Sequence, residues 1–224
     1  MIVDGGTSTY AEGPERDAVR SIGAHNTIRV DGADQFEVWK SFRVGRRAGV
    51  HDVNTHSETD YGYVTGRHDG YRSLGIEHRR TIFNLRIGGW LVVDNISGTG
   101  WHAVDSLLHL APEVRPEISG NVAELHPTEW CVTLIAMPAV SVLADLHSPR
   151  LGVRLASTTL AGRSYAKLPL TWVYWIAPHL RAALDWNGLR DGVLSLSTPS
   201  GRLDINPLFV GTYLKNLTNP VGWV

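Results

Sequence analysis

Side chains that bind cations or anions gather near the start of the chain. Asp4 is the first of them, and Tyr10, Arg16, Arg20 and His25 follow along a short segment that contains several glycines. Aspartate and histidine are good zinc ligands, and arginine pairs well with carboxylates and sulfates. The residues alone leave two interpretations open. Either the segment is a metal-binding loop, or Asp4 braces a turn and His25 is a hydrogen-bonded structural histidine.

The two arginines of this segment also have two possible tasks. They pair with a carboxylate or sulfate of a ligand, or they brace the loop against Glu12 and Asp17. The residue types favour neither alternative. Asn26, the neighbour of His25, is expected to hydrogen-bond backbone groups rather than a ligand.

Further side chains each allow a functional and a structural interpretation. A polar stretch contains possible ligands of a second metal, but their spacing fits no standard motif and favours surface strands and loops: His51, Asp52, His56, Asp60, His68 and Asp69. A basic cluster meets an acidic glycan or forms a solvated edge: Arg43, Arg46 and Arg47. Several tryptophans stack on sugars or, as is commoner in a sandwich, pack in the core: Trp39, Trp90, Trp101, Trp172, Trp175 and Trp186. His78 and His109 lie in strand-like runs and are expected to be hydrogen-bonded structural residues.

Short runs rich in β-branched and aromatic residues recur along the chain and are separated by turn-forming residues. The clearest are Thr27–Val30, Gln35–Phe42, His78–Leu85, Trp90–Asp94, Ala103–Leu110, Cys131–Met137, Thr171–Ile176, Val193–Ser197 and Arg202–Ile205. Gly88-Gly89 predicts a hairpin turn between two of them. At most one short helix is expected, near residues 12–22, with Pro14 close to its start. The pattern predicts an all-β fold, an antiparallel multi-stranded β-sandwich, as one domain over residues 1–224.

Composition excludes several classes of function. The chain has 224 residues and a formal net charge of −1, whereas a nucleic-acid binder needs a strongly basic face. Cys131 is the only cysteine, so an intrachain disulfide is impossible. No run approaches the roughly 20 apolar residues of a membrane-spanning helix, and the first residues lack the features of a signal peptide. The sequence therefore predicts neither a nucleic-acid partner nor a membrane partner.

Several motifs occur in a characteristic order. The first are Val3-Asp4-Gly5-Gly6-Thr7-Ser8-Thr9-Tyr10, Gly13-Pro14-Glu15-Arg16, Arg20-Ser21-Ile22-Gly23-Ala24-His25-Asn26-Thr27 and Val30-Asp31-Gly32. The later ones are His68-Asp69-Gly70-Tyr71, His78-Arg79-Arg80, Trp90-Leu91-Val92-Val93-Asp94 and Leu108-His109-Leu110-Ala111-Pro112. This order resembles the heparinase II/III-like family of polysaccharide lyases, most clearly over the first half of the chain.

The resemblance implies a fold and a chemistry. Members of this family join an α/α toroid to a C-terminal β-sandwich, and the chain resembles only the sandwich. They cleave uronate-containing polysaccharides by β-elimination, which requires neutralisation of the uronate carboxylate together with a base and an acid. In the family these groups come from the toroid and from a His-x-His-x-Asp motif at the start of the sandwich. That motif is absent from the 224 residues.

The resemblance also assigns site residues. Asp4 and His25 match the second and third ligands of the family's metal site, which usually holds zinc, while the missing motif supplies the first. Two protein ligands are expected to bind zinc weakly. Tyr10 lies where some relatives place a tyrosine that faces the substrate, and Arg16 and Arg20 are candidate substrate-binding residues beside it.

The sequence thus predicts the C-terminal domain of a polysaccharide lyase, inactive alone, that supplies part of a metal site and of the substrate wall. The expected partners are an acidic polysaccharide, such as a glycosaminoglycan or alginate, and the missing N-terminal toroid. The relatives imply a bacterial protein that is periplasmic or secreted, and the abrupt start indicates a fragment of a longer enzyme. The alternative is a non-catalytic carbohydrate-binding or structural β-sandwich module.

Overall fold

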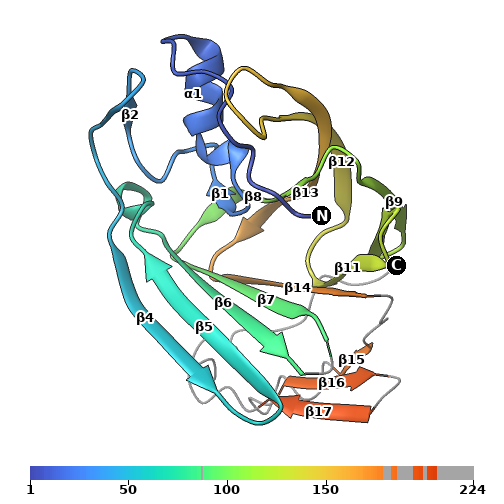
Figure 1. Ribbon diagram of the computed structural model, residues 1–224. Helices are drawn as coiled ribbons and strands as arrows, with labels where there is room; N and C mark the ends of the chain where they lie inside the picture. The colour runs from blue at the N-terminus through green and yellow to red at the C-terminus, as the bar shows by residue number, and fades with distance from the viewer. Residues whose placement is uncertain (87, 179–182, 186–193, 199–200, 206–224) are drawn as a thin grey trace.

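The computed structural model describes residues 1–86, 88–178, 183–185, 194–198 and 201–205 (Figure 1). Its helical elements are α1 Pro14–Arg20 and the short 3-10 turns η1 Ile22–Ala24 and η2 Arg72–Leu74. Its strands are β1 Ile28–Val30, β2 Val38–Trp39, β3 Arg43–Val44, β4 Val50–Ser57, β5 Tyr61–His68, β6 Glu77–Leu85, β7 Trp90–Ser97, β8 Trp101–Leu110, β9 Arg115–Ser119, β10 Val122–His126, β11 Trp130–Ala136, β12 Val140–His147, β13 Leu155–Lys167, β14 Leu170–Pro178, β15 Ala183–Asp185, β16 Leu194–Thr198 and β17 Gly201–Ile205.

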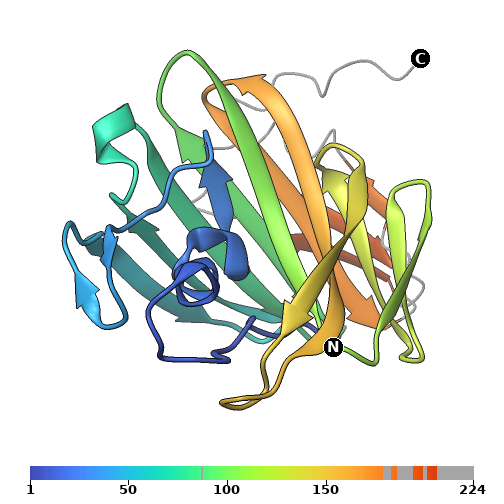
Figure 2. The ribbon, with the colours of Figure 1, turned by 90° about the horizontal axis from the view of Figure 1, so that it is seen from above.

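Two antiparallel sheets face each other and form the sandwich. The larger sheet has eight strands in the order β4-β5-β6-β7-β14-β11-β10-β9, and the smaller has four in the order β1-β8-β13-β12. Figure 2 shows β4 and β5 to one side of the four-stranded sheet. Two small sheets complete the described part, β15-β16-β17 and the hairpin β2-β3.

Burial changes from the centre of the larger sheet to its edge. The central strand β7 is buried at every position from Leu91 to Ile96, because both of its faces are covered. The edge strand β4 is exposed along its whole length. Its register shifts between His51 and Asn54, an irregularity that makes an open edge less suitable for pairing with another strand.

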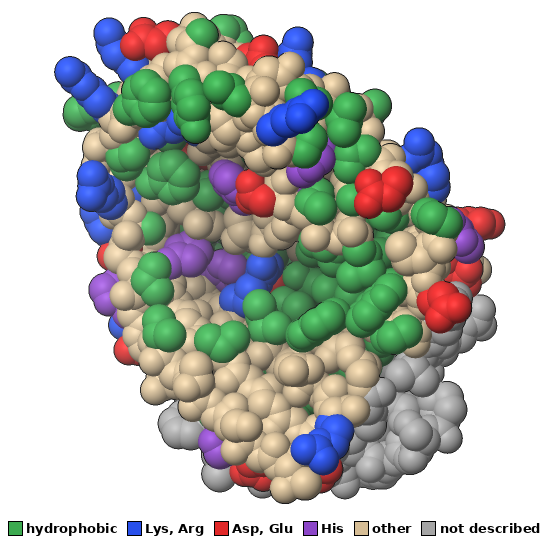
Figure 3. Space-filling model, in the orientation of Figure 1, with side chains coloured by type: hydrophobic (Ala, Val, Ile, Leu, Met, Phe, Trp, Pro, Cys, Tyr) green, Lys and Arg blue, Asp and Glu red, His purple; other side chains and the backbone are tan. Residues whose placement is uncertain are grey.

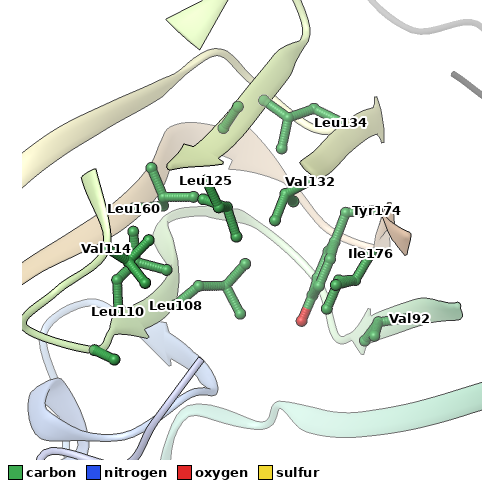
Figure 4. Packing of buried hydrophobic residues seen from close by; sticks show 12 residues of the cluster. Val92, Leu108, Leu110, Val114, Leu125, Val132, Leu134, Leu160, Tyr174 and Ile176 are labelled. Atoms are coloured by element: carbon green, nitrogen blue, oxygen red, sulfur yellow. The ribbon is translucent and has the colours of Figure 1, made fainter. Parts of the chain in front are cut away.

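Aliphatic side chains of both sheets form the main core (Figure 4). Leu108, Leu110 and Leu160 of the smaller sheet pack with side chains of the larger sheet: Val92, Leu125, Val132, Leu134, Tyr174 and Ile176. Each such side chain contributes about 1.5–3 kcal/mol when it is fully buried. A second cluster around Ile28, Tyr71, Ile96 and Trp172 closes the sandwich at the β1 end.

The predicted all-β sandwich and the single short helix are confirmed. The helix is shorter than residues 12–22, since α1 ends at Arg20 and a 3-10 turn follows. The predicted strand Gln35–Phe42 is wrong, because only Val38–Trp39 is extended and the chain then turns into a hairpin. Of the predicted strand Val193–Ser197, residue 193 lies outside the described residues and the remainder belongs to β16. No helix of the described part is long and apolar enough to span a membrane.

Candidate functional site

Asp4 and His25, distant in sequence, are in direct contact. The Nδ1 atom of His25 lies 2.7 Å from Oδ2 of Asp4, and the backbone N–H of Gly6 donates to the other carboxylate oxygen at 3.2 Å. Burial alone would raise the pKa of Asp4, but these hydrogen bonds more than offset it and the pKa is lowered. The carboxylate is therefore ionised near neutral pH and can accept a hydrogen bond from Nδ1 of His25.

Glycines let the first loop approach the end of β12. The backbone N–H of Ser148 donates to the carbonyl of Gly5 at 2.8 Å, and Gly6 pairs with Ser148 in a parallel bridge. Gly6 has a φ of 75°, and a Cβ at this position would lie 2.0 Å from the carbonyl oxygen of Ser148. Only glycine combines this conformation with this contact. The Gly5-Gly6 pair therefore fixes the loop that carries Asp4.

Asn26 connects three segments through its side-chain amide and its backbone. Its amide donates to the carbonyl of Val3 at 2.8 Å and accepts the backbone N–H of His109 at 2.7 Å. The expectation that Asn26 bonds backbone groups is confirmed. Because Asn26 follows His25 in sequence, these bonds also fix the position of His25 against Asp4.

A buried ion pair of the larger sheet holds the backbone of Asn26 through a hydrogen bond. Arg80 on β6 donates through Nε and Nη2 to the two oxygens of Asp94 on β7, at 2.6 and 2.9 Å. Its Nη1 donates to the backbone oxygen of Asn26. Burial alone would raise the pKa of Asp94, but the charge of Arg80 and a hydrogen bond from His78 outweigh it and hold the pKa far below its ordinary value. The pair is therefore fully ionised inside the protein.

A chain of hydrogen bonds extends from this ion pair to β5. The backbone N–H of Gly70 donates to Nδ1 of His68, so Nε2 of His68 carries a proton and donates to Nδ1 of His78 at 3.0 Å. Nε2 of His78 then donates to Asp94 at 2.8 Å. Burial, together with the neighbouring His78, lowers the pKa of His68 to about 4. Each ring of the chain thus has one defined tautomer near neutral pH.

A second histidine–carboxylate pair lies under the first loop. Nδ1 of His109 lies 2.6 Å from Asp145 on β12, which also accepts the hydroxyl of Thr159. Partial burial would raise the pKa of Asp145, but these two hydrogen bonds outweigh it and the pKa is lowered. Nε2 of His109 is buried and has no hydrogen-bond partner in the described part of the chain. The expectation that His78 and His109 are hydrogen-bonded structural residues is confirmed.

The Asp4–His25 pair has the donor chemistry of a zinc site but not a full set of ligands. Two atoms that each lie about 2.0–2.1 Å from one tetrahedral zinc ion are roughly 3.3 Å apart, so the 2.7 Å separation is that of a hydrogen bond. In the ranges that the structure describes, no group of three or more His, Cys, Asp or Glu side chains is placed to hold a metal ion. A tight site on these two residues requires a ligand from elsewhere.

Of the three candidate substrate-binding residues, Arg16 and Arg20 belong to α1 and Tyr10 precedes it. Tyr10 is about half exposed, and its ring lies 5.5 Å from that of Phe42. Arg16 is buried and donates two hydrogen bonds to the carbonyl of Ser41. The partners of Arg20 are the backbone oxygens of Lys40 and Arg43. Both arginines thus brace the β2–β3 hairpin, and within the described residues neither forms an ion pair with Glu12 or Asp17.

The other groups singled out in the sequence are spread over different environments. The polar stretch from His51 to Asp69 forms the surface strands β4 and β5, as expected. Arg46 of the basic cluster donates to backbone oxygens of Asp34, Gln35 and Gly70, whereas Arg43 and Arg47 are exposed. Trp172 and Trp175 are buried, but the expectation that most of these tryptophans are core residues is too broad, since Trp39, Trp90 and Trp101 are exposed. Trp186 lies outside the described residues.

The face of the larger sheet that carries Arg80 is concave. Figure 3 shows a hollow lined by hydrophobic side chains, with histidine and basic side chains at its edge. Strand alternation places Arg80 and Ile82 on the same face of β6, and Val64 pairs with Ile82 on β5 and is exposed. An ionic and an apolar region therefore lie next to each other on this side of the larger sheet.

A family model described as heparinase II/III-like, C-terminal, matches residues 1–159. The chain belongs to this family. The matched residues include the first loop, the Arg80–Asp94 pair and the His109–Asp145 pair. The heparinase II/III-like domain therefore contains every contact described above for Asp4 and His25.

Solved structures with the same sandwich support the assignment of the fold. Heparan sulfate lyase HepC from Pedobacter heparinus is similar with a TM-score of 0.70 and 15% identity, over 90% of this chain and 33% of that chain. A heparinase III described as the BT4657 gene product gives 0.69 and 14%, over 91% and 34%. Another heparinase III gives 0.67 and 16%, over 91% and 33%. The chain thus spans about a third of the length of these proteins. A comparison with curated proteins found no match.

Sequence reasoning found His78 and His109 but missed their acidic partners and Arg80. A signal for Arg80 and Asp94 was present, because the turn at Gly88-Gly89 joins two runs that pair across a hairpin. The antiparallel register of that hairpin places residue 80 opposite residue 94. Asp145 gave no such signal, since β12 reaches β8 only through β13.

Proposed function

We propose that this chain is the C-terminal sandwich domain of a polysaccharide lyase that cleaves uronate-containing glycans by β-elimination. The observation that carries the proposal is the Asp4–His25 contact at 2.7 Å, in a loop that buried groups hold in place. Asn26, Arg80 and Asp94 form that support, and Asp94 is completely buried. Such support is typical of a site whose geometry matters for function.

The role of the domain is to hold and orient groups at the edge of a substrate cleft. The Asp4 carboxylate and the His25 ring are in contact at 2.7 Å, and their side chains are 61% and 35% exposed, so a ligand can reach both. Asp4 and His25 would hold zinc together with a ligand supplied by the upstream region. A bound zinc ion would supply a fixed positive charge beside an anionic substrate.

The proton transfers of β-elimination are carried out by groups of the N-terminal toroid and of the upstream His-x-His-x-Asp segment. The substrate class is an acidic polysaccharide, a glycosaminoglycan or alginate, and the enzyme is bacterial and periplasmic or secreted. Family membership and the heparan sulfate and heparinase titles of the similar structures support the choice of a polysaccharide as substrate. The domain alone is expected to be inactive.

Zinc titration tests the site. In the 224-residue chain we expect weak binding, and in a longer protein that includes the upstream His-x-His-x-Asp segment we expect tight binding. His25→Ala should lower the affinity of the longer protein at least tenfold, because one of three ligands is lost. His56→Ala is the matched control, since His56 is an exposed histidine hydrogen-bonded to Glu58 far from the loop. Equal zinc affinity of the longer protein and its His25→Ala variant would contradict the assignment.

A further inference from the structure

The hairpin of residues 37–46, called here the aromatic hairpin, exposes large apolar side chains to solvent. Trp39 is 53% exposed and Phe42 is 73% exposed, and Tyr10 beside them is 51% exposed. Aromatic side chains this large are normally buried, and their clustering on a surface marks an interaction site. The hairpin consists of only two short strands, which pair through Val38 with Val44 and Trp39 with Arg43.

The hairpin is held by two arginines of α1. Arg16 is buried, although it carries a charge, and its Nε and Nη2 atoms both donate to the carbonyl of Ser41 at 3.2 and 3.0 Å. The donors of Arg20 bind the carbonyls of Lys40 and Arg43 on either side. Hydrogen bonds from a charged group are stronger than neutral ones. These bonds therefore fix the turn of the hairpin to the helix.

The exposed rings are fixed as well as the backbone. The guanidinium carbon of Arg16 lies 5.1 Å from the centre of the Tyr10 ring and 6.0 Å from that of Phe42. The indole N–H of Trp39 donates to Glu37 at 2.9 Å, and the ring lies so close to Gly45 that a Cβ there would be 2.9 Å from it. Rigid aromatic side chains bind a partner with little loss of entropy.

The charges around the rings are mainly basic. Lys40 and Arg43 are exposed, and Lys40 reaches one carboxylate, that of Glu12, only at 4.0 Å. No ion pair joins Arg43 to any residue that the structure describes. The nearby carboxylate of Glu37 already accepts hydrogen bonds from Trp39 and the backbone of Arg46. The tip of the hairpin thus combines open ring surface with available positive charge.

We infer that the aromatic hairpin binds an acidic saccharide, with Trp39 and Phe42 as stacking surfaces and Lys40 and Arg43 as partners of its carboxylate or sulfate groups. Arg16 and Arg20 then act through the hairpin as positioning residues rather than as contacts of the substrate. The inference rests on the proposed function, which makes an acidic glycan the ligand of the protein.

Binding of size-defined oligosaccharides to the 224-residue chain tests the inference. The probes are a heparin oligosaccharide with sulfates and carboxylates, a hyaluronan oligosaccharide with carboxylates alone, and neutral dextran. The double variant Trp39→Ala/Phe42→Ala should bind heparin about tenfold more weakly, the size expected for the loss of exposed aromatic contacts. Arg43→Gln should weaken binding and reduce its dependence on salt. Dextran should not bind.

The matched control is Trp101→Ala/Tyr165→Ala. These rings are stacked 5.7 Å apart on β8 and β13 and are 59% and 70% exposed, so the control removes a similar exposed aromatic pair elsewhere. The control should bind like the wild type. Thermal unfolding and circular dichroism verify that each variant is folded.

Three results would overturn the inference. The first is equal heparin affinity of the hairpin variant and the control, and the second is absence of binding to both acidic probes. The third, with anionic lipid vesicles as a further probe, is that the hairpin variant loses binding to the vesicles but not to the saccharides. The ratio of heparin to hyaluronan affinity distinguishes sulfate from carboxylate recognition. Lyase activity of the longer protein is measured separately through its unsaturated product. An active enzyme with unchanged glycan affinity in the hairpin variant would therefore refute the hairpin inference and leave the proposed function intact.

Discussion

Arg80 links the interior of the sandwich to the loop that carries the candidate site. It is the one described side chain that contacts both the buried carboxylate of Asp94 and the backbone of Asn26. A buried ion pair gives little net stability, since desolvation offsets the attraction, but the removal of one partner leaves a buried charge uncompensated. The intact ion pair therefore adds little to the stability compared with an apolar pair, whereas loss of Arg80 alone is expected to be costly.

Arg80→Leu is expected to lower the free energy of unfolding by about 3–5 kcal/mol, because Asp94 would remain buried without its partner. The double variant Arg80→Leu/Asp94→Leu should recover most of that loss. Urea denaturation of the two variants and the wild type measures both values. A loss below about 1 kcal/mol in the single variant would show that Asp94 is stabilised without Arg80.

At the scale of single residues, the sequence indicates which side chains could take part in a site better than it indicates which side chains they contact. Asp4 and His25 were identified from a motif, and the structure brings them together, but their role as metal ligands stays a prediction. Asp145 could not be recognised, because a carboxylate in a strand has the same appearance whether it faces solvent or a buried histidine. Pairing across strands that are far apart in sequence decides between the two.

The first loop is an element whose position depends on glycine. Gly6→Ala should force the loop away from β12, since the new Cβ would meet the carbonyl of Ser148 at 2.0 Å. Gly32→Ala is a close control, because Gly32 has a φ of 68° and open space around it. Both variants should lose about 1–2 kcal/mol through the left-handed backbone.

Hydrogen exchange distinguishes the two glycine variants. The amide of Ser148, which donates to Gly5 in the wild type, should lose its protection in Gly6→Ala and keep it in Gly32→Ala. Retained protection of Ser148 in Gly6→Ala would contradict the proposed docking of the loop.

Strands were predictable where both faces are buried or alternate clearly. β6, β7, β8 and β14 contain the predicted runs, because apolar side chains dominate β7, β8 and β14 and alternate with polar ones in part of β6. β4 is not among the predicted strand-like runs, since an edge strand that is exposed on both faces shows no alternation of apolar and polar residues. The hairpin of β2 and β3 was mistaken for one strand, because its aromatic residues suggest burial although they are exposed.

For the whole molecule, the sandwich corresponds to about a third of the similar lyase structures. The all-β architecture was predictable from run lengths and turn residues. Its single-domain organisation over residues 1–224 stays a prediction, as do its localisation and its partners. The packing of the first loop was not predictable, because it depends on contacts between segments far apart in sequence: Asn26 with Val3, Ser148 with Gly5, and Arg80 with Asn26.

The most direct test of the account is a β-elimination assay that follows the ultraviolet absorbance of the unsaturated product. It compares the 224-residue chain with a longer protein that carries the upstream helical region, on heparan sulfate and on alginate. We predict no product from the chain alone, product from the longer protein on one of these glycans, and a rate at least tenfold lower after His25→Ala. Product formation by the chain alone, or an inactive longer protein that is correctly folded, would contradict the proposal.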